Sequence, residues 1–279
     1  MNGETRLTTL ENGFRVVSER LPGVRTAAVG VWVDVGTRHE PAGLDGVAHL
    51  LEHMAFKGTR TRTARQIAEA IEAVNKVDAR MGRRLGTTQS WEAVRASWND
   101  LRENYARLKS DDSFQRHTQL IGQIIQHIRL VGDKTGLTTD PELDTYYLVD
   151  SMLQQIPWTV EYLGQLASYG SGVAARQSMT AAEEAQIRYL VRQVSSSIES
   201  LQRNYRSAFG YNDEVREKLD ETLATAMNAA GFLRNLTQKE LLESTSISVQ
   251  PVAYIENGTS AVQKLFALHD ETASTVRCL

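Results

Sequence analysis

The residues best placed for chemistry are His49, Glu52 and His53, which fall within five consecutive positions. On a helix, positions i, i+3 and i+4 share one face, so these three side chains would project together. Two imidazoles one turn apart can hold a zinc ion, and a neighbouring carboxylate can take a proton from water that the zinc activates. The spacing therefore predicts a zinc-dependent hydrolytic site.

The elements that would position these residues are a helix and the strands before it. Asp45 can cap a helix that Gly58 ends, which places the three side chains on a helix. Residues 27–36 alternate strictly between apolar valines and other residues, which is typical of a strand. Residues 6–21 read as strand, turn, strand around Asn12-Gly13, a dipeptide favoured in tight hairpins. The motif is thus expected on a helix entered from a sheet.

After residue 75 the sequence becomes helical in pattern. Capping boxes begin at Thr63 and Thr180, and Gly170-Ser171-Gly172 is predicted to be a turn. Apolar residues recur at helical spacing in these stretches: 67–85, 91–108, 117–131, 146–167, 187–205, 215–233 and 252–276.

Such stripes are best buried as an antiparallel bundle. We therefore expect a mainly α fold, with four or more long helices, preceded by a small, incomplete α+β segment of two or three strands. The expected domains are residues 1–75 and 76–279.

Composition and charge exclude some classes of function. The net charge is −3 and no run of Lys or Arg could track a phosphate backbone, so nucleic acid is not an expected partner. No stretch reaches the roughly 18 to 20 apolar residues that cross a bilayer, and the N-terminus lacks the apolar core of a signal peptide. The single Cys278 excludes an intrachain disulfide. The sequence therefore does not predict the cellular compartment of the protein.

The first quarter of the chain resembles a known family of enzymes. The resemblance runs through Leu10-Glu11-Asn12-Gly13, residues 31–40, residues 49–59 and residues 67–74. These stretches are similar to the start of pitrilysin-type zinc peptidases, which include insulinase and the mitochondrial processing peptidases. The resemblance implies that His49 and His53 are zinc ligands and that Glu52 is the general base.

The resemblance also implies a third zinc ligand that the sequence does not supply. Family members take it from a glutamate some seventy-odd residues beyond the motif, whereas no glutamate lies between Glu103 and Glu142 here. With two ligands in place of three, zinc would bind weakly.

Residues from about 75 to 279 resemble another family, the extracytoplasmic helical-bundle sensor domains of bacterial chemoreceptors and sensor kinases. The similar stretches are residues 77–82, 91–98, 127–133 and 137–150. Such sensors normally lie between two membrane helices, neither of which is present in this sequence. The whole chain therefore resembles a fusion of a peptidase N-terminus with a sensor bundle.

Within the bundle, a cluster of four residues is a candidate ligand site. Tyr146, Tyr147 and Asp150 would face Arg129 if their helices pair, and could bind a small polar or anionic molecule. The structural alternative is an interhelical salt bridge with the tyrosines in the core. His117 and His269 lie on apolar stripes and are expected to be core histidines.

These observations lead to one principal expectation and two alternatives. The principal one is a non-catalytic, chemoreceptor-like sensing domain that binds a small molecule between helices, or a second copy of itself, and carries a vestigial peptidase segment. The first alternative is a zinc metallopeptidase that uses His49, Glu52 and His53. The second is an artificial or misassembled fusion with no evolved function as a unit.

Overall fold

The computed structural model describes residues 4–9, 15–20, 64–104, 107–139 and 141–278. The chain divides into two compact units, Met1–Gly36 and Thr37–Leu279.

The first unit contains a β-hairpin. Strand β1 (Glu4–Thr9) pairs antiparallel with β2 (Arg15–Arg20), and the register places Glu4 opposite Arg20 and Thr9 opposite Arg15. This pairing confirms the predicted strand, turn, strand pattern. The Asn12-Gly13 turn and the strand predicted at residues 27–36 lie outside the described residues.

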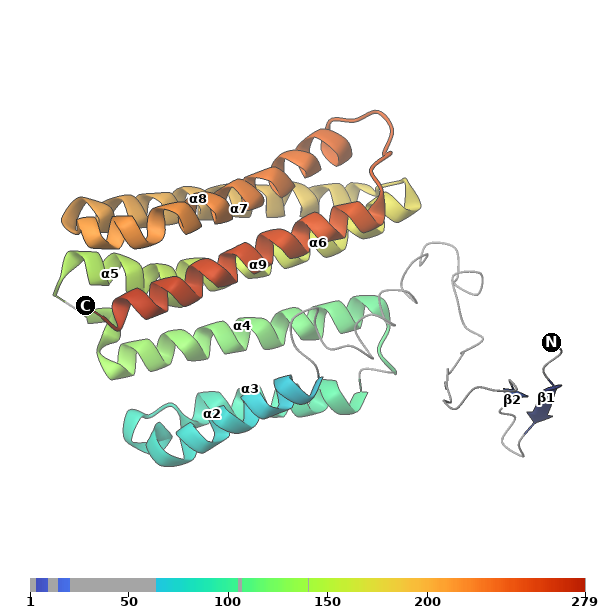
Figure 1. Ribbon diagram of the computed structural model, residues 1–279, viewed down its shortest axis with the longest axis horizontal. Coiled ribbons are helices and arrows are strands. Elements are labelled where there is room, and N and C mark those ends of the chain that lie inside the picture. Colours follow the sequence, from blue (N-terminus) through green and yellow to red (C-terminus); the bar gives the residue numbers. More distant parts are fainter. Residues whose placement is uncertain (1–3, 10–14, 21–63, 105–106, 140, 279) are drawn as a thin grey trace. The chain divides into compact units, whose positions relative to one another are not determined.

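The described part of the second unit is helical, which confirms the predicted mainly α fold (Figure 1). Its elements, in chain order, are α2 (Ala64–Leu85), α3 (Thr88–Asn104), α4 (Ser110–Thr135), the 3₁₀ turn η3 (Leu137–Thr139), α5 (Leu143–Asp150), the π-helical turn η4 (Ser151–Gln155), α6 (Ile156–Arg176), α7 (Ala181–Tyr211), α8 (Asp213–Thr237), the π-helical turn η5 (Gln238–Leu242) and α9 (Pro251–Val276).

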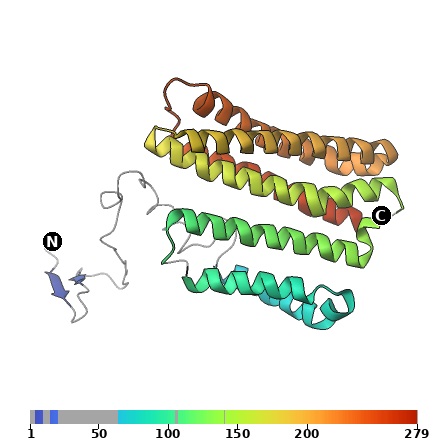
Figure 2. The same ribbon diagram turned by 180° about the vertical axis from the view of Figure 1, so that it is seen from behind.

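The long helices of this unit lie in layers. In both views, α4 lies between the α2–α3 pair on one side and α6 with α9 on the other, and α7 and α8 lie beyond α6 and α9 (Figures 1 and 2). The main core is built by α5 to α9, with Leu163, Leu201 and Leu265 fully buried. A smaller core around Trp91 and Leu120 joins α3 to α4. A third cluster, of Val149, Met152 and Leu153, contacts Ile128 of α4, so the described helices have apolar cores on both sides of α4.

Two helix starts follow from local side-chain chemistry. The Thr180 hydroxyl accepts a hydrogen bond from the backbone N–H of Glu183, whose carboxylate accepts one from the backbone N–H of Thr180. This reciprocal pair is the capping box predicted from the sequence. Asn212 caps α8 by accepting from the backbone N–H groups of Glu214 and Val215. These caps satisfy donors that the first helical turn leaves unpaired.

The predicted turn at Gly170-Ser171-Gly172 is wrong, because these residues lie inside α6. The glycine there serves packing between helices. A Cβ atom at Gly170 would lie 2.3 Å from ring atoms of Tyr254, and one at Gly258 would lie 2.3 Å from the Cβ of Ala167. Missing side chains at these two positions therefore let α6 and α9 approach closely.

The apolar stripe predicted at residues 146–167 is divided among α5, η4 and α6. Pro157 stands in the first turn of α6, directly after the π-helical turn. Proline has no N–H to donate and its ring crowds the carbonyl four residues earlier, so the hydrogen-bond pattern changes before it. The irregularity therefore lies just before Pro157.

Glu161 is a buried carboxyl group between α4 and α6, with 5% of its surface exposed. It accepts a hydrogen bond of 2.6 Å from Gln165 Nε2, and Thr118 of α4 also bonds to it. Burial raises the pKa of Glu161, and these two hydrogen bonds offset the rise only in part. The folded protein therefore binds the Glu161 proton more tightly than the unfolded chain does.

Replacing Glu161 with glutamine is expected to raise the free energy of unfolding at neutral pH, because a charged group no longer has to be buried. Since the folded pKa is raised, the stability that Glu161 contributes is present at low pH and lost as pH rises through that pKa. The gain from the substitution should thus shrink as pH approaches the ordinary value of 4.5. Urea unfolding of both proteins at pH 7.5 and 4.5 measures this, and an equal difference at the two pH values would contradict it.

Candidate functional site

The three residues of the predicted zinc site, His49, Glu52 and His53, lie outside the described residues. The described chain resumes at α2, shortly after the motif. Among the residues that the structure describes, no group of three or more His, Cys, Asp or Glu side chains could hold a metal ion.

The four residues proposed from sequence as a ligand site are not joined by the expected ion pair. Arg129 Nε lies 3.9 Å from Asp133 Oδ2 on its own helix, and both side chains are about half exposed. Asp150 instead accepts a hydrogen bond of 2.7 Å from Asn204 Nδ2 of α7. Tyr146 and Tyr147 touch edge to face, with ring centroids 5.4 Å apart. Asp150 thus joins α5 to α7, and its partner is an amide rather than a guanidinium.

The two histidines that the sequence placed on apolar stripes, His117 and His269, lie at partly exposed positions. His117 Nδ1 lies 2.7 Å from the backbone oxygen of Ser113, within its own helix. His269 Nδ1 lies 3.3 Å from Asp270 Oδ1. Neither belongs to the buried core, so the prediction that His117 and His269 are core histidines is wrong.

Among the described histidines, His127 is buried, and its pattern in the sequence did not distinguish it from the others. Its exposed fraction is 8%, its Nδ1 lies 3.2 Å from Ser90 Oγ, and its ring centroid lies 5.4 Å from that of Trp91. Burial lowers the pKa of His127, and the negative charge of Asp78 offsets this in part. Burial of the ring therefore favours the neutral form of His127.

A signal for this cluster was present in the sequence at Asp78, which interrupts the apolar stripe of α2. The Asp78 carboxylate accepts a hydrogen bond from the Thr88 hydroxyl at 3.3 Å, and Asn75 Oδ1 accepts one from the indole N–H of Trp91 at 2.9 Å. Asp78 and Asn75 of α2 therefore bind residues of α3. The spacing of apolar residues does not predict these pairs, because the two helices are separated by a turn.

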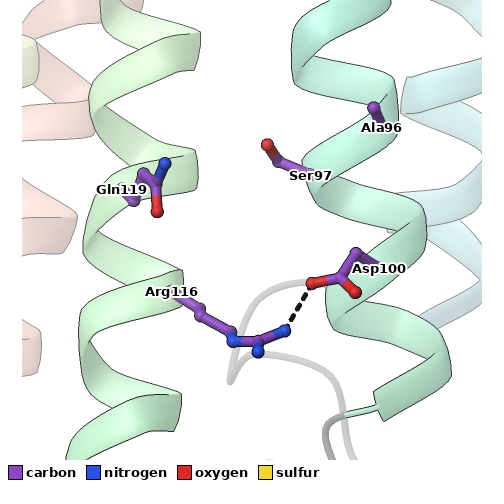
Figure 3. A pocket seen from close by; sticks show the side chains of 5 residues that line it. All are labelled: Ala96, Ser97, Asp100, Arg116 and Gln119. Atoms are coloured by element: carbon purple, nitrogen blue, oxygen red, sulfur yellow. Dashed lines mark hydrogen bonds and ion pairs between the residues drawn. The ribbon is translucent and has the colours of Figure 1, made fainter.

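A polar pocket of about 500 Å³ opens between α3 and α4 (Figure 3). Figure 3 shows Arg116 reaching from α4 to Asp100 on α3, and their side-chain atoms lie 2.5 Å apart. Ser97 and Gln119 line the pocket beside them. Because both charged side chains are about half exposed, this ion pair contributes only about 0 to 1 kcal/mol. The pocket has no nucleophile paired with a base, so we assign it no chemistry.

Across the described ranges, no helix combines the length and the apolar character that a bilayer crossing requires.

Comparison with known proteins gives a match in the first part of the chain. A model of the insulinase family (peptidase family M16) matches residues 15–81, which include the zinc motif and most of α2. An uncharacterized zinc protease of Mycobacterium leprae is 63% identical over 67 residues, covering 24% of this chain and 15% of that protein. An uncharacterized zinc protease of Bacillus subtilis is 50% identical over 66 residues, covering 24% of this chain and 16% of that protein.

A longer match extends to a eukaryotic protein. The beta subunit of the mitochondrial-processing peptidase of Rattus norvegicus is 39% identical over 127 residues, which cover 46% of this chain and 22% of the subunit. No solved structure matches the chain. The chain thus spans between 15% and 22% of the length of these three relatives.

The expectation of a non-catalytic, chemoreceptor-like sensing domain is wrong as the account of this chain's function. The matching family and the relatives described above are zinc peptidases, which corresponds to the first alternative. None of these matches supports a role in chemotaxis or signal transduction. The segment at residues 15–81 is similar to M16 zinc peptidases, and zinc is the cofactor that this similarity supports.

Proposed function

We propose that this chain carries a zinc-peptidase centre of the insulinase type, in which His49 and His53 hold zinc and Glu52 is the general base for peptide hydrolysis. The observation that carries the proposal is the H-x-x-E-H spacing inside the segment matched by the family model. The identities of 63% over 67 residues and 50% over 66 residues to zinc proteases support it further.

The donor set at this spacing suits zinc. Neutral imidazole is a preferred zinc ligand, and two histidines separated by one helical turn can bind the same ion. Zinc, when bound, would act as a Lewis acid on the substrate carbonyl and would make water more acidic. The Glu52 carboxylate, which would share a helical face with the histidines, would accept the proton of the attacking water and return it to the leaving amine.

The proposed centre needs a third protein ligand for tight binding, since catalytic zinc sites usually have three. The sequence offers no glutamate between Glu103 and Glu142, where the resemblance would place it. We therefore expect zinc to bind more weakly here than in a centre with three protein ligands.

Zinc binding is tested by equilibrium dialysis of the full chain followed by metal analysis. We expect one zinc per chain, and His49→Ala or His53→Ala should weaken binding by about a hundredfold or more, since even outer-shell changes cost about 10- to 100-fold. His269→Ala is the matched control, because this partly exposed histidine lies on α9 and should leave zinc binding unchanged. Equal zinc binding by His49→Ala and the unsubstituted chain would overturn the assignment.

A further inference from the structure

The described helices form an apolar groove of about 430 Å³ between α2 and α4. We call it the α2–α4 groove. Val74, Val77 and Met81 line it from α2, and Ile128 and Val131 line it from α4. Leu153 of η4 also contributes to the lining. Most of the lining is apolar, and its polar members are Asp78, Thr87, His127 and Thr135.

The lining residues of α2 are unusually exposed for their type. Val74, Val77 and Met81 expose 38%, 52% and 38% of their surface, respectively. They do not face the small core between α3 and α4, against which Ile71 packs and toward which Asn75 accepts its hydrogen bond from Trp91. Contiguous exposed apolar side chains of this kind mark interaction sites in soluble proteins.

The rim of the groove on α2 is positively charged. Arg80 and Arg84 stand three and seven residues after Val77, so they continue its row along the helix surface. Among the described residues, neither arginine forms an ion pair with a carboxylate. Asp78, which lines the groove itself, accepts a hydrogen bond from the Thr88 hydroxyl. The rim therefore has cationic charge without a partner in the described part of the chain.

We propose that the α2–α4 groove is a docking site for an acidic amphipathic helix of a partner protein. The α2 side runs from Ala73 to Leu85, which at 1.5 Å per residue is about 18 Å, or about three helical turns. A helix with apolar residues at i, i+3, i+4 and i+7 would place them against Val77 and Val131, as in other helix-in-groove complexes. Asp or Glu residues beside those anchors would meet Arg80 and Arg84. The proposal is independent of zinc binding at the motif.

The first test uses a fluorescein-labelled, 15-residue helical peptide with leucines at i, i+3, i+4 and i+7 and glutamates on both flanks. Fluorescence anisotropy with the full chain should show saturable binding, and Val77→Asp should weaken it by about tenfold or more, because a carboxylate would have to be desolvated in the groove. Val252→Asp is the matched control, since Val252 is 60% exposed on α9 and should leave binding unchanged. Circular dichroism verifies that both variants fold.

The second test reverses the charge of the rim. Arg84→Glu should weaken binding of the glutamate-flanked peptide by about tenfold and strengthen binding of an otherwise identical lysine-flanked peptide, because complementary charge selects partners. Failure of the glutamate-flanked peptide to bind, or equal loss in Val77→Asp and Val252→Asp, would overturn the proposal. Sedimentation velocity gives a third outcome. Dimerisation of the chain that Val77→Asp abolishes would assign the groove to a second copy, and would overturn the proposal of a different partner.

Discussion

Replacing Glu52 with glutamine is expected to lower the rate of peptide hydrolysis by a factor of about 100 to 10,000, the usual contribution of a positioned general base. Glutamine keeps the size of the side chain but cannot accept a proton from water. Because Glu52 is not a zinc ligand in the proposed centre, zinc content should stay unchanged. The measurement is kcat/KM for cleavage of an internally quenched peptide, with zinc analysis of both proteins.

The control for this substitution is Glu72→Gln, an exposed glutamate of α2 within the same matched segment. It accepts a hydrogen bond from Asn75 and should leave cleavage unchanged. Cleavage that survives in Glu52→Gln would remove Glu52 from the mechanism. Zinc binding without any cleavage by the unsubstituted chain would refute the peptidase proposal and leave the metal assignment standing.

Replacing Gly170 with alanine is expected to lower the free energy of unfolding by about 3 kcal/mol, at the upper end of typical overpacking costs. The new Cβ would lie 2.3 Å from ring atoms of Tyr254, whose hydroxyl bonds to Thr237 Oγ1 at 2.6 Å in the core. Burial raises the pKa of Tyr254 to about 12, so this hydroxyl stays neutral and bonded across the ordinary pH range. Displacing the ring would break that contact. Urea unfolding monitored by circular dichroism measures the change.

The same helix provides the opposite control. A Cβ at Gly164 would meet nothing within 4 Å, so Gly164→Ala should stabilise α6 by about 0.5 to 1 kcal/mol through its effect on backbone entropy. Opposite signs for the two substitutions are the expected result. A stabilising effect at Gly170 would show that α9 does not pack against α6 as described.

Much of the fold was predictable from the sequence, because helix periodicity and caps are local. The Thr180 capping box and the stripe ending at Leu85 needed only neighbouring residues to interpret. The role of Gly170 was not predictable in this way. A glycine can end a helix, or it can lie inside a helix and leave room for a side chain of a neighbouring helix. Only the position of Tyr254 on α9 shows that Gly170 has the second role.

In the candidate site, too, the residues close together in the sequence could be predicted, and contacts between distant residues could not. The spacing of His49, Glu52 and His53 predicts a zinc site from five consecutive residues. A third ligand comes from a distant part of the sequence, so its position depends on tertiary contacts that local spacing does not predict. His127 was missed because its partner, Ser90, comes from another helix. The sensing role was wrong because helical periodicity specifies a scaffold, and one scaffold can carry many functions.

The two π-helical turns, Ser151–Gln155 and Gln238–Leu242, affect how the length of this chain can change. A π-helical turn spans one residue more than an α-helical turn between its hydrogen-bonded ends. Loss of one residue there would leave an ordinary α-helical turn and keep every later side chain on its present face. The same loss in the middle of α7 would rotate the rest of its buried stripe by about 100°. Single-residue deletions during evolution are therefore best accommodated at these two turns.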